Sequence, residues 1–261
     1  MNDLEILLSL NQMLLSDMPQ YRRQAADFSM DALSQWQLFR SLVNVRLPGP
    51  ISKEFLPLQD SFLQKMIEKK GITDLSSLTP IQKNLYLWQG DITTLRVDGI
   101  VNAANSGLTG CYYPCHSCID NAIHTFSGVQ LRLECANIME KQGYPEPVGQ
   151  AKITNSYNLP CQYILHTVGP MINISPSEKD CQQLVSCYQS CLKLAEQNHL
   201  TSIAFCCIST GEFHFPSQKA AEIAIKTVCK YLKDHKNMKI IFNVFSSKEY
   251  QIYRNLLDSL L

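Results

Sequence analysis

Residues 99–126 read GIVNAANSGLTGCYYPCHSCIDNAIHTF, and this stretch decides the fold class. It opens with a short apolar run at 99–103, which is typical of a buried strand. It ends in the first part of segment 119–141, whose apolar residues recur at helical spacing. A loop rich in glycine and cysteine joins the two. A strand, a loop and a helix in this order indicate an α/β domain with parallel strands.

The same alternation continues on both sides of this stretch. Further strands are predicted at 85–88, 151–157, 163–167, 202–208 and 239–245, and further helices at 177–197, 217–235 and 247–260. We therefore expect a layered α/β domain with a largely parallel sheet. Such sheets bind ligands beyond the carboxyl ends of their strands, so the loops after 99–103 and 202–208 are the first candidates for a site.

The chain before residue 80 has a different pattern. Apolar residues repeat at helical spacing over 3–16, 19–44 and 53–70, and Pro48-Gly49-Pro50 interrupts them. We divide the chain into a helical extension, residues 1–79, and a main domain, residues 80–261. The extension has no histidine, cysteine or glycine-rich loop, so we expect it to pack on the main domain or to bind a partner and assign it no chemistry.

Composition narrows the class of function. The chain has 261 residues, 45% of them hydrophobic, and its 23 Lys and Arg balance 23 Asp and Glu. A neutral balance argues against a protein that coats nucleic acid. No apolar run approaches the roughly 18 residues that span a bilayer, and Met1–Glu5 does not begin a secretory signal. We expect a cytoplasmic protein with no membrane partner.

Eleven cysteines are present, and all lie at or after Cys111. In a reducing compartment, clustered cysteines more often bind metal or react than form disulfides. The cluster here is Cys111, Cys115, His116 and Cys118. Three hypotheses are open: a catalytic zinc with three ligands and a free position, a structural zinc held by all four residues, or a redox pair in the CxxC motif of Cys115 and Cys118.

Two loops carry groups suited to a phosphorylated ligand. Residues 209–216 place hydroxyls, a glycine and consecutive amides before a helix, which favours a phosphate cradle. Asn102 and Asn105 follow strand 99–103, where their amides can meet sugar hydroxyls. Each signal is weak when taken alone.

Four motifs together give a more specific result. In order they are Gly90-Asp91-Ile92-Thr93, Asn102-Ala103-Ala104-Asn105, Ile119-Asp120-Asn121-Ala122-Ile123-His124 and Ser209-Thr210-Gly211-Glu212-Phe213. Over residues 80–261 the chain resembles macrodomains, the α/β modules that bind ADP-ribose. The resemblance implies a three-layer α/β/α fold with a mixed, largely parallel sheet.

The segment 110–118 replaces the usual glycine run of that family with cysteines and a histidine. It resembles the zinc-containing branch of macrodomains, whose members also carry a helical N-terminal extension. This resemblance implies a microbial hydrolase that removes ADP-ribose from proteins. It also implies a functional link to a class M sirtuin that modifies a lipoyl-carrier protein, so such a carrier is an expected substrate.

The resemblance also implies binding roles. Asp91 would receive the adenine amino group beside the Ile92 backbone, and Phe245 would pack on adenine. Backbone amides of the phosphate loop would wrap the diphosphate; these residues are Ser209, Thr210, Gly211, Glu212 and Phe213. Asn102 and Asn105 would meet the distal ribose, with Asn105 the more direct contact.

Catalytic and metal roles follow in the same way. Asp120 would lie near the scissile C1″ bond, with Asn105 beside it, and one Zn²⁺ per chain would bind Cys111, His116 and Cys118. Cys115 then has no family role. We interpret His124 and His166 as structural and keep His214 as a reserve ligand contact. These histidine assignments are hypotheses from position only.

The expected activity is zinc-dependent removal of mono-ADP-ribose from protein side chains by cleavage at C1″. An ester to an acidic residue fits best, because its leaving group needs least protonation. The alternative is a non-catalytic reader of ADP-ribose with a structural zinc.

Overall fold

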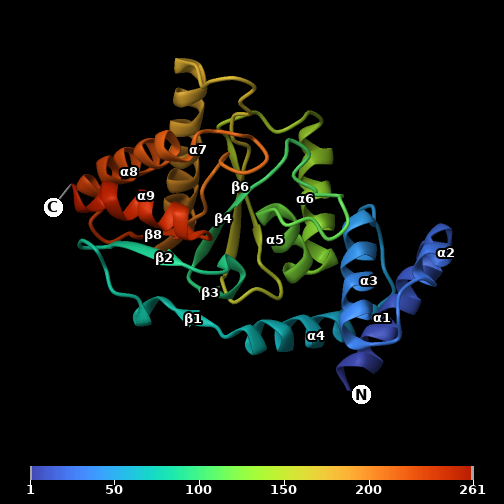
Figure 1. Ribbon diagram of the computed structural model, residues 1–261. Helices are drawn as coiled ribbons and strands as arrows, with labels where there is room; N and C mark the ends of the chain where they lie inside the picture. The colour runs from blue at the N-terminus through green and yellow to red at the C-terminus, as the bar shows by residue number, and fades with distance from the viewer. Residues whose placement is uncertain (1, 260–261) are drawn as a thin grey trace.

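The computed structural model describes residues 2–259, and a six-stranded sheet forms its centre (Figure 1). The strand order is β2 (Leu85–Gln89), β8 (Lys239–Val244), β7 (Ser202–Phe205), β4 (Gly99–Ala103), β6 (Tyr163–Thr167) and β5 (Ala151–Asn155). Neighbouring strands are parallel except β5, which runs antiparallel to β6. The sheet is therefore mixed and largely parallel, as predicted.

Helices cover both faces of this sheet. One layer holds α7 (Glu178–Gln197), α8 (Ser217–Asp234) and α9 (Ser247–Asp258), and the other holds α5 (Ile119–Ser127) and α6 (Val129–Gln142) (Figure 1). The expected three-layer α/β/α arrangement is confirmed. The last helix was expected to reach residue 260, which lies outside the described residues; within them it ends at Asp258.

A single helix over 119–141 was predicted, and this is wrong. Gly128 separates α5 from α6 with a φ of 99°, a backbone conformation that only glycine adopts readily. A Cβ there would lie 2.6 Å from the side-chain nitrogen of Gln59, so the position also leaves no room for a side chain. Apolar periodicity continues across the break, which is why the pattern did not reveal it.

The extension is helical, as predicted, and packs against the α5 and α6 layer (Figure 1). Its helices are α1 (Asp3–Asp17), α2 (Arg22–Ala25), α3 (Ala32–Val45) and α4 (Phe55–Lys70), with a 3₁₀ turn η1 (Pro19–Tyr21). The continuous helix expected over 19–44 is wrong. The chain leaves the helix after Ala25, and Asp31 starts α3 by accepting the amides of Leu33 and Ser34 at 3.0 Å.

Aromatic side chains join the extension to the main domain. The Trp36 ring lies 5.7 Å from Phe39, 5.8 Å from Phe62 and 5.7 Å from Phe126 of α5, measured between centroids. Short elements follow: β1 (Thr73–Asp74), η2 (Leu75–Ser77), η3 (Ile92–Thr94) and β3 (Leu95–Arg96), with β1 and β3 paired in parallel. The boundary at 79/80 stays a prediction.

Candidate active site

A cavity of about 1240 Å³ opens beyond the carboxyl ends of β4, β7 and β8. The strand predicted over 202–208 ends at Phe205, which is the last residue of β7 to pair with β8. After that point Cys206 and Cys207 line the cavity. Likewise, β5 ends at Asn155 and not at 157. The early end of β7 opens the space that both candidate loops surround.

Asp91 stands at one end of the cavity, at the start of η3. Its Oδ1 accepts the Thr93 amide at 3.0 Å and the Thr93 hydroxyl at 2.6 Å, and its Oδ2 accepts Lys70 Nζ at 2.7 Å. Burial raises the pKa of Asp91, but the hydrogen bonds from Lys70 and Thr93 outweigh it and leave the pKa below its usual value. The group is therefore a carboxylate at neutral pH. Ile92 beside it is buried and lines the same wall.

Phe245 lies at the same end and follows β8 directly. Its side chain is 78% exposed, which is unusual for a phenylalanine and leaves the ring free to stack on a planar ligand. Asn243 of β8 holds the end of this strand next to the turn that carries Asp91, because its Nδ2 donates to the Gly90 carbonyl at 2.9 Å. The two groups expected at adenine thus line one end of the cavity.

The phosphate loop, residues 209–213, lines another wall. Ser209 has a left-handed φ of 66°, and its carbonyl accepts the Phe215 amide at 2.9 Å, so the loop is tightly closed. Among residues 2–259, the amides of Gly211, Glu212 and Phe213 donate to no protein acceptor. Free amides in such a turn are suited to anionic oxygens. This arrangement supports the predicted cradle.

Asp120 lies in the first turn of α5 and is 5% exposed at the cavity wall. Its Oδ1 accepts Asn102 Nδ2 at 2.8 Å, and its Oδ2 accepts Asn105 Nδ2 at 3.3 Å. Burial raises the pKa of Asp120 to about 6, against the lowering effect of the Asn102 hydrogen bond and the charge of Arg132. A buried carboxylate that accepts two hydrogen bonds at a cavity wall is a candidate for proton transfer or for orienting water.

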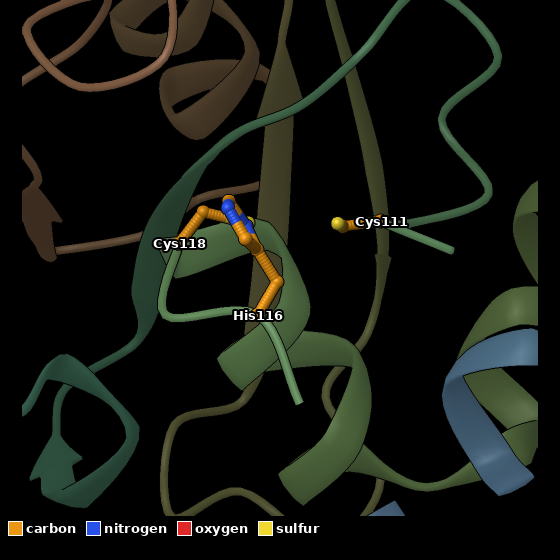
Figure 2. A group of neighbouring side chains, drawn as sticks. All are labelled: Cys111, His116 and Cys118. Atoms are coloured by element: carbon orange, nitrogen blue, oxygen red, sulfur yellow. The ribbon is translucent and has the colours of Figure 1, made fainter. Parts of the chain in front are cut away.

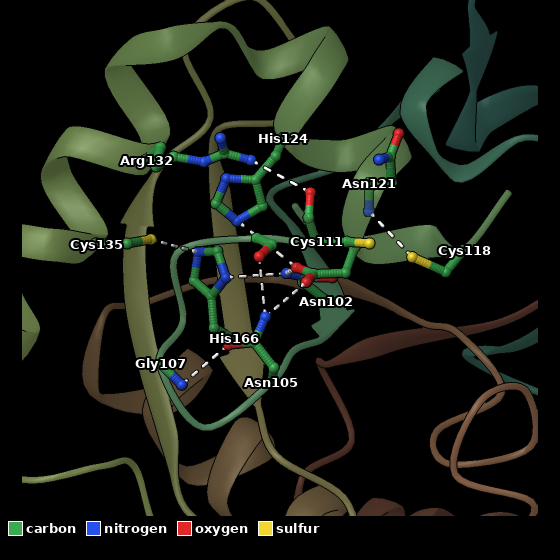
Figure 3. Close-up of polar contacts among 12 residues, drawn as sticks. Asn102, Asn105, Gly107, Cys111, Cys118, Asn121, His124, Arg132, Cys135 and His166 are labelled. Carbon is green, nitrogen blue, oxygen red and sulfur yellow. Dashed lines mark hydrogen bonds and ion pairs between the residues drawn. The ribbon is translucent and has the colours of Figure 1, made fainter. Parts of the chain in front are cut away.

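The two asparagines differ in position. Asn105 lines the cavity, whereas Asn102 is fully buried behind it and is absent from the described lining. Asn102 Nδ2 donates to Asp120 Oδ1. It also lies 3.1 Å from His166 Nδ1, a contact that Figure 3 shows. The structure therefore does not bring Asn102 to a ribose contact. It places Asn102 as a support beneath Asp120, because strand β4 directs this side chain inward.

Cys111, His116 and Cys118 point toward one another (Figure 2). Their ligand atoms all lie within 4.8 Å of one another. Around a tetrahedral zinc with bonds of about 2.0–2.3 Å, ligand atoms are roughly 3.3–3.8 Å apart. His116 Nδ1 is buried without a partner among the described residues, and its Nε2 lies 3.6 Å from Glu212 Oε1. The three residues fit a zinc ion, and Glu212 is placed to orient the imidazole.

Cys115 does not belong to this group. Its left-handed backbone, with a φ of 53°, turns the side chain toward α3. There its Sγ lies 3.4 Å from the Gln37 carbonyl and 3.4 Å from Ser41 Oγ. Cys115 and Cys118 are both free thiols, and the Cys115 thiol faces α3. These observations favour a three-ligand metal site over the structural and redox hypotheses.

The remaining histidines lie outside the cavity lining. His166 is fully buried and satisfied, with Nδ1 at Asn102 and Nε2 2.9 Å from Thr154 Oγ1, as the structural interpretation expects. His124 is buried next to it, with its ring 6.0 Å from that of His166. His214 is exposed and does not line the cavity formed by the described residues. The structure does not support His214 as a reserve contact.

Two lining residues come from the extension, to which we assigned no chemistry. Arg40 of α3 and Lys70 of α4 both line the cavity. Lys70 Nζ also lies 3.5 Å above the Phe126 ring. In the sequence, Lys70 resembles an ordinary lysine at a helix end and Arg40 an ordinary surface arginine. No local pattern distinguishes either of them.

Comparisons with known proteins agree with this geometry. The family model described as "Macro domain" matches residues 101–224. A protein-ADP-ribose hydrolase of Treponema medium is 53% identical, over 99% of this chain and 100% of its own length. A protein-ADP-ribose hydrolase of Staphylococcus aureus strain MSSA476 is 54% identical, over 84% of this chain and 83% of its own.

Solved structures give the same result. An Oceanobacillus iheyensis macrodomain with ADP is 35% identical, with a TM-score of 0.64 over 70% of this chain and 95% of its own. A Trypanosoma brucei macrodomain in complex with ADP-ribose is 29% identical, with a TM-score of 0.65 over 84% of this chain and 94% of its own. With the sheet order, the four motifs and the cavity at the strand ends, these likenesses show that the chain belongs to the macrodomain family.

Proposed function

We propose that this protein is a protein-ADP-ribose hydrolase that releases mono-ADP-ribose by cleaving the bond between C1″ of the distal ribose and a side chain. The observation that carries the proposal is the position of Asp120, a buried carboxylate in the cavity wall beside the metal-ligand group. A module that only binds ADP-ribose needs neither feature. Two relatives named protein-ADP-ribose hydrolase, each more than half identical, support the same activity.

The proposed binding pose follows the cavity from end to end. The Asp91 carboxylate accepts the adenine amino group, and the exposed Phe245 ring stacks on the base. The free amides of Gly211, Glu212 and Phe213 hold the diphosphate. The distal ribose then reaches Asn105 and Asp120. The loop amides and the Phe245 ring are free to contact a ligand, whereas hydrogen bonds within the protein hold the carboxylates of Asp91 and Asp120 in place.

Asp120 is the proposed general base or water-orienting group. Its two oxygens are fixed by the amides of Asn102 and Asn105, so the carboxylate needs little reorganisation during the reaction. Cleavage at C1″ passes through an oxocarbenium-like state, which a nearby carboxylate stabilises. Asn105 is proposed to hold both the carboxylate and the ribose.

We propose one zinc ion on Cys111, His116 and Cys118. Bound there, zinc supplies a Lewis acid and lowers the pKa of adjacent water. The fit of the three ligand atoms, the unpaired His116 Nδ1 and the Glu212 carboxylate behind the ring support this assignment. The Cys115 thiol contacts the Gln37 carbonyl of α3, so Cys115 is not among the residues that would hold the ion.

The preferred linkage is an ester to an acidic side chain. A carboxylate leaves without protonation, whereas a serine or threonine oxygen needs a proton. This chemistry supports the acidic-residue substrate.

One assay tests activity, metal and linkage together. The purified protein is incubated with a peptide carrying ADP-ribose on glutamate, and with one carrying it on serine, with and without a zinc chelator. We expect release of free ADP-ribose from the glutamate peptide and its loss on chelation. Cys118→Ala should behave as the chelated protein, whereas Cys229→Ala, which changes a cysteine of α8 outside the cavity, should retain activity.

Each failure has a separate meaning. ADP-ribose binding without release from either peptide would make the protein a reader. Unchanged release in Cys118→Ala would remove zinc from the reaction, and faster release from serine would overturn the ester preference.

The lipoyl-carrier substrate, the sirtuin link and the cytoplasmic location stay predictions. No helix within residues 2–259 is long and apolar enough to cross a membrane.

A further inference from the structure

Helix α3 of the extension lies against the cysteine loop, which we define as residues 111–118. Arg40 Nη2 donates to the His116 carbonyl at 3.3 Å and to Asn121 Oδ1 at 3.0 Å. One turn further along the helix, Asn44 Oδ1 accepts the Cys115 amide at 2.9 Å. These bonds join segments that are more than 70 residues apart in the chain, so the contact belongs to the tertiary structure and not to a local turn.

The cysteine loop has little structure of its own. Within it, the only backbone hydrogen bond among the described residues runs from the His116 amide to the Tyr113 carbonyl at 3.3 Å. Tyr113 is 69% exposed, so solvent and not core packing surrounds much of this segment. A loop with so few internal bonds does not by itself fix three ligand atoms. Its conformation must come from its surroundings.

Asn121 carries the contact from Arg40 to a metal ligand. Its Oδ1 accepts Arg40, its Nδ2 donates to the Tyr113 carbonyl at 3.0 Å, and its backbone amide donates to Cys118 Sγ at 3.4 Å (Figure 3 shows the last bond). Arg40 therefore acts on Cys118 through one residue and on His116 directly at its carbonyl. Arg40 thus contacts the segment that carries two of the three proposed ligands.

Arg132 carries a similar contact to the third ligand. Its Nη2 donates to the Cys111 carbonyl at 3.4 Å. Its Nη1 donates to the carbonyls at the end of α3, at 2.9 Å for Val43 and 2.7 Å for Asn44. The carbonyl end of α3 is thus tied to the backbone that holds Cys111, and all three ligands are linked to the same helix.

We propose that α3 holds the cysteine loop in its metal-binding arrangement, with Arg40 as the positioning residue. This proposal rests on the zinc site of the proposed function. Groups behind metal ligands orient them, and their loss typically lowers metal affinity about 10–100-fold. The extension is then part of the metal-binding site. Losing the contacts between α3 and the cysteine loop should lower zinc affinity more than it lowers folding stability.

The test uses the full chain with Arg40→Met and the conservative Arg40→Lys. The matched control is Arg23→Met, an exposed arginine of α2. Zinc content is measured first, and zinc affinity is then measured by competition with a chromophoric chelator. Cobalt absorption in the visible range reports the ligand geometry, and thermal melting of the metal-free proteins reports folding.

We expect Arg40→Met to bind zinc about 10–100-fold more weakly than wild type, with a changed cobalt spectrum and a metal-free melting curve close to that of Arg23→Met. Arg40→Lys should recover part of the affinity, because an ammonium can still donate to the His116 carbonyl. A role in stability alone would lower the melting temperature and leave zinc affinity unchanged.

Equal zinc affinity in wild type and Arg40→Met would overturn the proposal and leave the proposed function intact. A wild-type protein that binds no zinc would overturn this proposal and the proposed zinc site, and the hydrolase assay would still test the activity. If Arg40→Met does not fold, Asn44→Ala gives the same comparison through the Cys115 contact. Wild-type zinc affinity in a folded Asn44→Ala protein would then count against the role of α3.

Discussion

Replacing Asn102 by alanine separates support of Asp120 from contact with the ligand. Asn102 Nδ2 donates to Asp120 Oδ1 at 2.8 Å, and the side chain is fully buried outside the cavity lining. A hydrogen bond to a charged group contributes about 1.5–3 kcal/mol. If that energy holds the carboxylate in its reactive position, kcat falls about 10- to 150-fold, since each 1.36 kcal/mol is a factor of ten.

The dissociation constant for ADP-ribose should stay near its wild-type value in Asn102→Ala, because Asn102 is fully buried and lies outside the cavity lining. Single-turnover release of ADP-ribose gives the rate, and calorimetry gives the affinity. Asn105→Ala is the comparison, because Asn105 lines the cavity and should lose both rate and affinity. A loss of affinity in Asn102→Ala as large as its loss of rate would refute the positioning role and restore the direct ribose contact.

Three further predictions concern the ends of the cavity and the fold around it. Phe245→Ala should weaken ADP-ribose binding about 5- to 150-fold by calorimetry, because stacking a base on an aromatic ring contributes about 1–3 kcal/mol; unchanged affinity would place adenine elsewhere. Burial lowers the pKa of His166 from 6.5 to about 3. Below pH 6.5 the unfolded chain therefore binds a proton that the folded protein does not, and the free energy of unfolding decreases as the pH is lowered. Wild type should lose about 2 kcal/mol more unfolding free energy between pH 7 and 5 than His166→Gln in urea titrations, and parallel losses would contradict this. Gly128→Ala should lower unfolding stability by about 1–3 kcal/mol through strain at its positive φ, and a stable variant would show that the turn can relax.

The order and type of the main elements could be predicted from local pattern. Strand 163–167 has the predicted ends, and α7 begins at Glu178, one residue from its predicted start. Alternation and helical spacing are properties of neighbouring residues, so the sequence shows them directly. Breaks inside a pattern are harder. Gly128 interrupts a helical face without interrupting its spacing, and the side chains that crowd it, Gln59 and Asn158, come from distant parts of the sequence.

Side-chain direction was the main limit at the site. The resemblance placed Asn102 and Asn105 together at the ribose, with Asn105 the more direct contact; in the structure Asn105 lines the cavity, whereas Asn102 lies in the buried strand β4 and does not. Cys115 and Cys118 have the spacing of a pair, and the backbone of Cys115 turns it away. Such choices depend on one dihedral angle, which composition and spacing do not report.

The cysteine loop and the extension looked like separate features in the sequence, and the structure makes them one unit. Among the described residues the cysteine loop has one internal backbone hydrogen bond, so its conformation needs bonds from outside the loop. Helix α3 supplies those bonds through Arg40 and Asn44, and Arg132 returns from the main domain to the end of the same helix. The Treponema medium relative aligns with 99% of this chain, so its likeness includes the extension as well as the loop. A mutation on the face of α3 that carries Arg40 and Asn44 would therefore change the surroundings of the proposed metal ligands Cys111, His116 and Cys118.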